Sequence, residues 1–199
     1  MIDPVRYIGN YSTGKMGFAL ADLLASMGAK VILICGPVKL KLKDPAIQRI
    51  DLTSADQMYE ACMKHFPGCD CAILTAAVAD YKPLMTEKEK IKRKEGTLTI
   101  ELRPNRDIAA ELGRIKRNNQ LVVGFALESQ NEIENAISKL KRKNLDMIVL
   151  NSIRDVGAGF GFDTNKVSIL MKDEKIFHYD LKSKGEVAKD IIHRILEIL

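Results

Sequence analysis

The sequence predicts an α/β fold: a doubly wound, mostly parallel Rossmann-like sheet with an antiparallel flap and a C-terminal hairpin. Two observations predict this fold class. Short, almost entirely apolar runs alternate along the chain with segments whose apolar residues recur every three or four positions. With 199 residues, 46% of them hydrophobic and 29% charged, the chain can also bury the core of one domain, which we expect to span residues 1–199.

Four apolar runs are the expected core strands, because strands buried on both faces of a parallel sheet carry few polar residues. They cover residues 31–35, 72–75, 121–126 and 147–150. The segments between them have the apolar stripe of a helix that packs on a sheet. These stripes cover residues 18–24, 58–62, 108–115 and 133–140.

Two further segments predict antiparallel structure. Residues 166–170 and 175–179 flank a polar connection, as the arms of a hairpin do, and a final helix is predicted over residues 187–195. An irregular segment, residues 83–102, separates the second core strand from the third helix. Its basic residues and the alternating stretch 98–102 predict a mobile basic flap with a strand pair.

Composition excludes some classes of protein. No apolar run approaches the roughly 18 to 20 residues of a membrane span, and the first ten residues lack the pattern of a signal peptide. We therefore expect a soluble, cytoplasmic protein with no membrane partner. The net charge of +5 is compatible with anionic small molecules as well as with nucleic acid. The four cysteines form no Cys-x-x-Cys pair, which favours reduced thiols.

Residues 9–16 nearly match the phosphate-binding loop pattern G-x-x-x-x-G-K-[ST]. Met16 stands where that loop needs a hydroxyl group to hold magnesium, and no apolar strand precedes the segment. A helix start capped by Ser12 or Thr13 is the alternative, and its backbone N–H groups still attract an anion. Residues 157–161 are also glycine-rich, but no helical pattern follows them, so we interpret them as a loop that enters the hairpin.

Small side chains at residues 75–79 follow the second core strand, and Asp80 comes next. Open α/β sheets bind ligands at the carboxyl ends of their strands, so Asp80 could accept a hydrogen bond from the exocyclic amine of a base. A solvated cap at a helix or turn start is the alternative. Phe125 ends the third core strand and is either a core residue or a stacking partner for the base. The predicted helix start at residues 105–107 offers backbone N–H groups to an anion or a hydroxyl.

Two basic runs, residues 88–94 and 139–143, are either solvated surfaces or parts of a site for several phosphates. Neither run has the interleaved aromatic residues of a nucleic-acid-binding surface, so we expect no nucleic-acid partner. His65, His178 and His193 fall in no catalytic pattern, and nucleophilic catalysis through histidine is not indicated.

Five segments together resemble one enzyme family in order and over essentially the whole chain. They are DPVRYIGNYSTGKMG at residues 3–17, AAVADY at 76–81, KIK at 90–92, VGFA at 123–126 and KNLD at 143–146. Through them the chain closely resembles bacterial phosphopantothenoylcysteine synthetases, also called phosphopantothenate-cysteine ligases. In many bacteria this synthetase is the C-terminal half of a bifunctional protein that begins with a flavin-dependent decarboxylase. The chain resembles only the synthetase half, so we expect no flavin.

The resemblance implies a ligase of coenzyme A biosynthesis. CTP, with Mg²⁺, would activate the carboxylate of 4'-phosphopantothenate as an acyl-cytidylate, and the amine of L-cysteine would then displace CMP. By resemblance, Lys90 contacts the triphosphate and steadies the leaving pyrophosphate while the flap closes over the site. Asn10 holds the activated carboxyl group, and Ala76 lies beside it. The family also implies a homodimer and a preference for CTP, whereas eukaryotic relatives accept ATP; the metal ligands stay unassigned.

The nucleotide-binding residues implied by the resemblance come from several parts of the chain. They are Leu74, Thr75, Ala76 and Asp80 after the second core strand, Arg106, Asp107, Ile108 and Ala109 at the third helix, Phe125, and Lys90, Lys139 and Lys143 in the basic runs.

Family members carry a hydrophobic strand and a glycine-containing turn just before the segment that matches residues 3–17. We expect that strand to belong to the parallel sheet, so its absence from this chain would affect stability and activity. A nucleotide-binding module without catalysis and a general phosphate-loop NTPase are the alternative functions.

Overall fold

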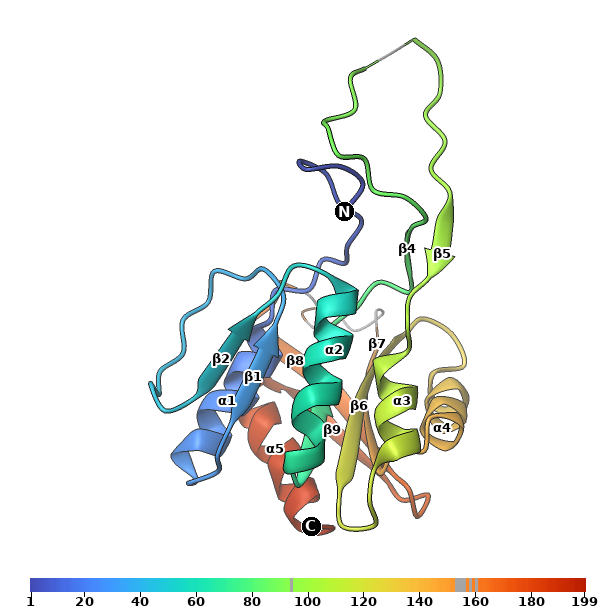
Figure 1. Cartoon of the computed structure of the whole chain (residues 1–199). Helices are drawn as coiled ribbons and strands as arrows, with labels where there is room; N and C mark the ends of the chain where they lie inside the picture. The colour runs from blue at the N-terminus through green and yellow to red at the C-terminus, as the bar shows by residue number, and fades with distance from the viewer. Residues whose placement is uncertain (94, 153–156, 158, 160) are drawn as a thin grey trace.

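A five-stranded sheet with the order β3-β6-β7-β8-β9 forms the centre of the molecule (Figure 1). β3 (Cys71–Leu74), β6 (Leu121–Glu128) and β7 (Met147–Ser152) are parallel, whereas β8 (Thr164–Met171) and β9 (Ile176–Ser183) form the antiparallel hairpin. The mostly parallel Rossmann-like sheet and its C-terminal hairpin are therefore confirmed. The computed structural model describes residues 1–93, 95–152, 157, 159 and 161–199.

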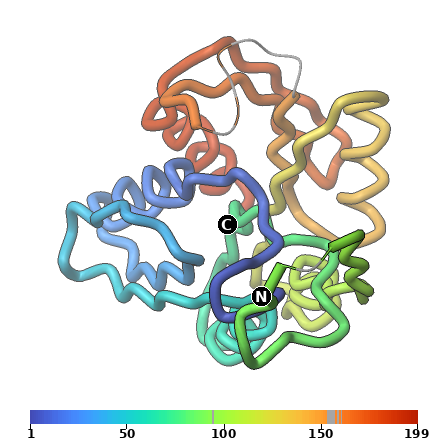
Figure 2. Tube along the Cα trace, turned by 90° about the horizontal axis from the view of Figure 1, so that it is seen from above, coloured from blue at the N-terminus to red at the C-terminus, as the bar shows by residue number. Residues whose placement is uncertain are grey.

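Helices cover both faces of this sheet, as the doubly wound pattern predicts (Figures 1 and 2). α1 (Lys15–Ser26) and α5 (Lys184–Leu196) pack together on one face. α2 (Ala55–His65), α3 (Ile108–Ile115) and α4 (Glu132–Arg142) cover the other face, with the short 3-10 helix η1 (Phe66–Gly68) after α2. Within the described ranges, no helix is long and apolar enough to cross a membrane.

The two cores follow from the alternation of side chains along each strand. In β7, Met147 and Val149 pack with α1 and α5, whereas Ile148 and Leu150 pack with α2, α3 and α4. Successive residues of a strand point to opposite faces, so a strand covered on both sides must be apolar throughout. This explains why the core strands were visible in the sequence as uninterrupted apolar runs.

A second, two-stranded parallel sheet is formed by β1 (Ile32–Cys35) and β2 (Gln48–Asp51). β2 was not predicted, because Gln48 and Asp51 are exposed and give the strand no apolar pattern. Among the described residues, β1 pairs with β2 and β3 pairs with β6, and no ladder joins β1 to β3. Residues of both strands line one cavity of about 1940 Å³. That the family's preceding strand belongs to the parallel sheet stays a prediction.

The flap leaves the body of the molecule through an antiparallel strand pair (Figure 1). β4 (Tyr81–Pro83) pairs with β5 (Leu102–Pro104), and the chain between them extends away from the sheets. The sequence placed a strand at residues 98–102, but residues 98–101 form no strand. The alternating apolar residues there do not form one buried face of a strand, because Leu98 and Leu102 are both exposed.

The start of α1 differs from the prediction. Neither Ser12 nor Thr13 caps the helix; Gly14 is the N-cap residue, with φ of 78° and no side-chain hydrogen bond to the first turn. A residue with a side chain rarely adopts that left-handed conformation, so the glycine is needed for the turn into the helix. By contrast, Ser54 caps α2 and Asp107 caps α3 through side-chain hydrogen bonds.

Candidate active site

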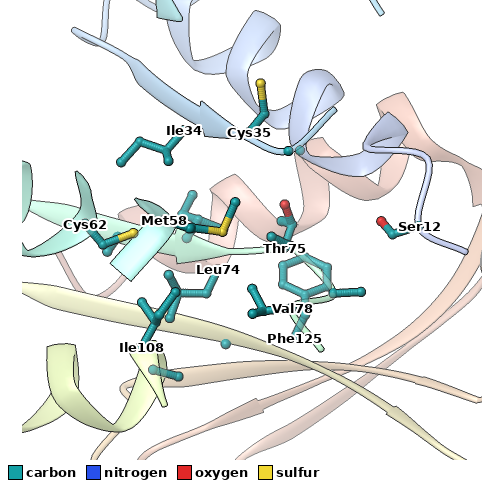
Figure 3. Close-up of a pocket in the computed structure, with 18 of the residues that line it drawn as sticks. Ser12, Ile34, Cys35, Met58, Cys62, Leu74, Thr75, Val78, Ile108 and Phe125 are labelled. Atoms are coloured by element: carbon teal, nitrogen blue, oxygen red, sulfur yellow. The ribbon is translucent and has the colours of Figure 1, made fainter. Parts of the chain in front are cut away.

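The cavity follows the gap between β1 and β3 along the strands and also reaches the carboxyl ends of β3 and β6, and its lining includes most of the site residues predicted from the sequence. Its apolar wall includes Leu74, Val78, Ile108 and Phe125, with Thr75 between α1 and β6 (Figure 3). The predicted residues that line it are Asn10, Leu74, Thr75, Ala76, Asp80, Arg106, Asp107, Ile108, Ala109, Phe125, Lys139 and Lys143. Segments far apart in the sequence therefore meet at the edge where open α/β sheets bind ligands.

Hydrogen bonds to backbone carbonyls fix the loop that follows β3. Asn10 donates from its amide nitrogen to the carbonyl oxygen of Ala77 at 2.9 Å, and the Asn105 amide donates to that of Ala79 at 2.7 Å. The backbone N–H of Asn105 also donates to the Asp80 carbonyl oxygen. The carboxylate of Asp80 stays exposed, and no helix begins there, so it caps none.

The phosphate-loop interpretation of residues 9–16 is not supported by the structure around them. No strand leads into these residues, and the ammonium group of Lys15 binds the Asp163 carboxylate at 2.7 Å and the Gly161 carbonyl at 2.9 Å. The segment instead brings α1 against the loop after β3. A β-carbon on Gly17 would lie 2.7 Å from the Thr75 hydroxyl oxygen, so a side chain at residue 17 would have to displace that hydroxyl.

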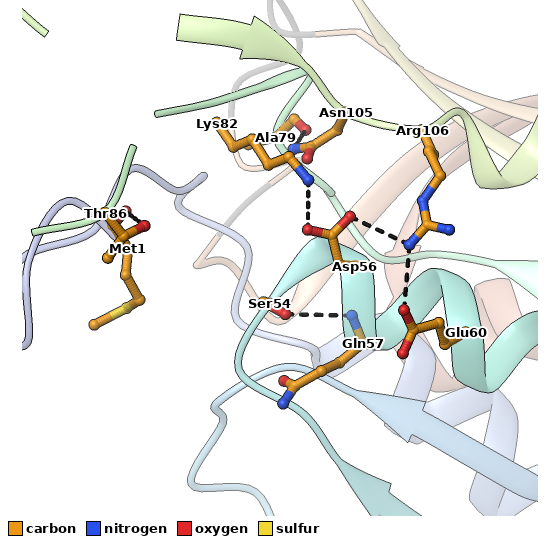
Figure 4. Close-up of polar contacts among 10 residues, drawn as sticks. All are labelled: Met1, Ser54, Asp56, Gln57, Glu60, Ala79, Lys82, Thr86, Asn105 and Arg106. Carbon is orange, nitrogen blue, oxygen red and sulfur yellow. Dashed lines mark hydrogen bonds and ion pairs between the residues drawn. The ribbon is translucent and has the colours of Figure 1, made fainter. Parts of the chain in front are cut away.

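The guanidinium of Arg106 contacts α2, while the side chain stays partly exposed to solvent (Figure 4). Its guanidinium lies 3.8 Å from the centre of the Tyr59 ring and 3.3 Å from the Asp56 carboxylate. Asp56 also forms an ion pair with Lys82, at the base of the flap, and this hydrogen bond is the main reason why the pKa of Asp56 is lowered. No sequence pattern predicts this network, because its members are separated in the chain.

The two lysines of the second basic run that the resemblance assigns to the nucleotide, Lys139 and Lys143, are paired with carboxylates. Lys139 donates to Glu128 at 2.5 Å, and Lys143 lies 2.9 Å from Asp107. Burial acts to raise the pKa of Asp107, but the hydrogen bonds from Lys143 and from the first turn of α3 outweigh it, so the pKa is lowered. A phosphate group entering the cavity would compete with these two carboxylates for the lysines.

Lys90 is the predicted site residue that does not line the cavity. It is exposed on the flap, beyond the β4–β5 pair. One position of the basic run 88–94, residue 94, lies outside the described residues, as do residues 158 and 160 of the glycine-rich segment. After that segment the chain enters β8 at Thr164, so the loop interpretation agrees with the order of elements.

The residues around the cavity do not form a metal cage by themselves. Within the described ranges, no three His, Cys, Asp or Glu side chains are grouped for one ion. Two carboxylates of the cavity region, Asp107 and Glu128, are already paired with lysines. Mg²⁺ usually keeps several waters and binds through one or two carboxylates and substrate phosphates. The magnesium expectation therefore fits an ion that arrives with a nucleotide, not one that the protein alone holds.

The sheet order and the position of the cavity define a Rossmann-like α/β domain that presents a ligand cavity at the carboxyl ends of its parallel strands. The profile of the DNA/pantothenate metabolism flavoprotein C-terminal domain matches residues 1–199. The chain belongs to this family.

Similar proteins agree with this membership. The chain is 59% identical over 198 residues to a protein named cysteine/cysteine sulfinic acid decarboxylase from an unknown prokaryotic organism, covering 100% of the chain and 55% of that protein. It is 44% identical over 194 residues to the coenzyme A biosynthesis bifunctional protein CoaBC of Bacillus subtilis, covering 98% of the chain and 48% of that protein. The chain thus spans about half the length of these relatives.

Solved structures locate the similarity within one half of CoaBC. The crystal structure of the C-terminal domain of a CoaBC protein superposes with a TM-score of 0.83 at 38% identity, covering 99% of this chain and 88% of that one. A DNA/pantothenate metabolism flavoprotein from Streptococcus pneumoniae superposes with a TM-score of 0.84 at 20% identity, covering 100% and 94%, which supports the fold alone. The resemblance to the synthetase half is therefore confirmed.

Proposed function

We propose that the chain is a phosphopantothenate-cysteine ligase that uses CTP. It would join 4'-phosphopantothenate and L-cysteine and release CMP and pyrophosphate, in coenzyme A biosynthesis. Relatives named for coenzyme A biosynthesis support the ligase class. A more distant protein with this fold, Cab2, has been solved in a mutant form with phosphopantothenate-cysteine, which agrees with the proposed product.

One observation carries the proposal: three separated segments meet at a single cavity. Asn10 comes from the N-terminal segment, Asp80 from the loop after β3, Lys139 from the last turn of α4, and Lys143 from its C-cap. The resemblance assigns these residues to the acyl group, the base and the phosphates respectively. An amide, a carboxylate and two cations that line the same cavity support a reaction between a carboxylate and a nucleoside triphosphate, because such a reaction needs groups of these kinds.

In the first half-reaction, a carboxylate oxygen of phosphopantothenate attacks the α-phosphorus of CTP. The new P–O bond forms as the bond to pyrophosphate breaks, which gives the acyl-cytidylate. Both reactants are anions, so cations must offset their repulsion. Lys139 and Lys143 would do so after exchanging Glu128 and Asp107 for phosphate, and Lys90 would join them when the flap closes. When bound, Mg²⁺ would neutralise further phosphate charge.

In the second half-reaction, the amine of cysteine attacks the acyl carbon, and CMP leaves as the amide forms. Asn10 would hold the acyl group in position for this attack. Its amide nitrogen already donates to the Ala77 carbonyl, which orients the side chain at the rim of the cavity. Closure of the flap would exclude water, which otherwise hydrolyses the cytidylate.

The protein would act as a cytoplasmic homodimer without flavin. Exposed apolar side chains gather on the N-terminal segment and the flap, and such patches commonly mark a protein interface. They include Val5, Tyr7, Tyr11, Leu84, Met85 and Leu98. Sedimentation velocity tests this part of the proposal, and a monomer at micromolar concentration would contradict it.

The decisive experiment combines the protein with CTP, Mg²⁺, 4'-phosphopantothenate and L-cysteine. We expect CMP and pyrophosphate in equal amounts, with the amide product identified by mass spectrometry and little turnover when ATP replaces CTP. The same assay on a longer chain, with an apolar strand and glycine turn before residue 1, tests the expected contribution of that strand to activity. If the longer chain also forms no CMP, the ligase proposal is wrong.

A nucleotide-binding module without catalysis is the second candidate. It is favoured by the position of Lys90, which is exposed on the flap and does not line the cavity. Calorimetry that detects CTP binding while the assay shows no turnover in either length of chain would support it.

A further inference from the structure

Asp3 is a fully buried carboxylate in a segment that is otherwise exposed. Its residue surface is 0% accessible, whereas residues 4–11 are all exposed. Carboxylates are almost never buried to this extent unless they are paired. Asp3 belongs to neither hydrophobic core, and none of the roles assigned above involves it. Its burial therefore calls for a separate explanation.

Several hydrogen bonds of the Asp3 carboxylate come from neighbouring residues of the chain. One carboxylate oxygen of Asp3 accepts the backbone N–H groups of Val5 and Arg6, both at 2.8 Å, which closes a turn. The other oxygen accepts the Arg6 guanidinium, with Nε at 2.9 Å. These hydrogen bonds from Arg6 hold the pKa of Asp3 well below its usual range. The group is charged at every pH at which the protein would work.

The remaining contacts of the pair reach the flap. The same Asp3 oxygen accepts the backbone N–H of Ile91 at 3.1 Å, and the Arg6 guanidinium donates to the carbonyl oxygen of Ile91 at 2.8 Å. Both backbone polar groups of Ile91 are thus held by one ion pair. Lys90 is the residue immediately before it in the chain.

Two further hydrogen bonds join the same segments. The backbone N–H of Glu87 donates to the Ile2 carbonyl at 3.0 Å, and the Thr86 hydroxyl donates to the Met1 carbonyl at 3.1 Å (Figure 4). Seen from above, the N-terminal segment runs beside the flap (Figure 2). These contacts and the Asp3–Arg6 pair tie residues 86–91 to residues 1–6 beyond the β4–β5 base.

The other end of the N-terminal segment is anchored at the cavity, where Asn10 donates to Ala77. The segment therefore spans from the loop after β3 to the flap. We propose that Asp3 is a positioning residue that docks the flap on the N-terminal segment, and so sets the place of Lys90 relative to Asn10. The catalytic consequence rests on the proposed ligase function, whereas the docking itself does not.

Asp3→Asn tests the docking with a small change of shape. The asparagine oxygen can still accept the two N–H groups of the turn, but its amide nitrogen then faces the Ile91 N–H and the Arg6 guanidinium, all of which are donors. Glu89→Gln is the matched control. It removes one negative charge beside Lys90 from an exposed flap carboxylate and breaks no hydrogen bond identified for the described residues.

Hydrogen exchange and trypsin cleavage of the flap report docking without any activity. Loss of a hydrogen bond to a charged group predicts about 10- to 100-fold faster exchange of the Ile91 amide in Asp3→Asn. Cleavage at residues 88–93 should accelerate in parallel, with an unchanged far-UV circular dichroism spectrum. In Glu89→Gln, the exchange of the Ile91 amide and the cleavage of the flap should proceed at the rates of the parent protein. Exchange that is equal in all three proteins overturns the docking.

Thr86→Val provides a second variant that leaves the buried pair intact. It removes a neutral hydrogen bond, so we expect only about 2- to 10-fold faster cleavage of the flap. This variant decides the case if Asp3→Asn does not fold: unchanged cleavage in Thr86→Val then counts against the docking.

The two half-reactions separate positioning from a merely structural role. In Asp3→Asn, pyrophosphate release should slow about tenfold or more, while preformed acyl-cytidylate should react with cysteine at the parent rate, because Asn10 keeps its anchor on Ala77. Equal slowing of both steps, or of neither step despite faster exchange, overturns the positioning role. A parent protein without ligase activity refutes the proposed function but leaves the exchange result to judge the docking.

Discussion

The contacts of Asp146, in the KNLD segment, predict a large loss of stability when its side chain is removed. Lys116 places its ammonium nitrogen 2.5 and 2.6 Å from the two Asp146 oxygens, and the two side chains are only 9% and 13% exposed. Asp146 also accepts the backbone N–H of Val122 at 2.8 Å, and its backbone carbonyl accepts the N–H of Lys172 at 2.9 Å. One residue thus joins the chain after α3, the start of β6 and the β8–β9 turn.

Asp146→Ala would leave the Lys116 charge in the interior without a partner. Removing one member of a buried ion pair costs about 3 to 5 kcal/mol in the free energy of unfolding. For a chain of this size, each kcal/mol lowers the melting temperature by roughly 2 to 4 °C, so we expect a decrease of about 6 to 20 °C. The lost Val122 hydrogen bond favours the upper part of that range.

Urea unfolding, followed by circular dichroism, and thermal melting measure the effect. Lys141→Ala is the matched control, because it breaks an ion pair with Glu174 on the surface. The side chains of Lys141 and Glu174 are 60% and 71% exposed. Exposed pairs contribute about 0 to 1 kcal/mol. Lys116→Met combined with Asp146→Ala should recover part of the loss, since no charge is then stranded. If Asp146→Ala loses no more than Lys141→Ala, the buried pair does not stabilise the fold as argued.

Four further predictions concern the site and the core. Asn10→Asp should slow consumption of the acyl-cytidylate by cysteine more than its formation, and an unchanged rate of consumption in rapid-quench assays would refute that role. Lys90→Gln should slow pyrophosphate release, whereas normal CTP-dependent activation would remove the assignment. Gly113→Ala would place a β-carbon 1.9 Å from a backbone oxygen at the C-cap of α4. We therefore expect the free energy of unfolding, measured in urea, to fall by about 1 to 3 kcal/mol. Gly185→Ala is the control, because the space around Gly185 is open and its free energy of unfolding should not change. Burial raises the pKa of Cys71 from 9.0 to about 12, so the folded state keeps this proton longer than the unfolded state. The free energy of unfolding should therefore fall above about pH 9, by up to ~1.4 kcal/mol per pH unit for this thiol. In Cys71→Ala the free energy of unfolding should fall less steeply with pH. Parallel curves of unfolding free energy against pH for the two proteins would contradict this.

Lys139 and Lys143, at the C-terminal end of α4, show why a basic run does not by itself define a phosphate site. Lys139 and Lys143 were predicted from charge and resemblance, and both line the cavity, but each already has a carboxylate partner in Glu128 or Asp107. The affinity for a nucleotide therefore depends on an exchange of partners. Asp107 has a second task, since it also caps α3.

Much of the fold was predictable from local patterns. The buried strands and the helical stripes follow from side-chain periodicity, and the hairpin follows from two short runs around a polar turn. The errors have local causes. β2 carries exposed polar ends, the alternating stretch at residues 98–101 has no partner strand, and Gly14 replaces the expected hydroxyl cap because a left-handed turn precedes α1. The periodicity of apolar residues indicates which face of a helix or strand is buried. It does not predict elements, such as β2 or the cap of α1, whose formation does not depend on a buried apolar face.

The sequence by itself determined the α/β class, the family and the segments that would meet at a ligand cavity, because apolar periodicity and ordered motifs are properties of neighbouring residues. Only the tertiary structure decided what those side chains bind in the absence of a ligand. Arg106 is held by Asp56 and Tyr59, and Lys90 is held away from the cavity on a flap that Asp3 connects to the N-terminal segment. Such contacts join residues up to 88 positions apart, and their distances depend on how the whole chain packs.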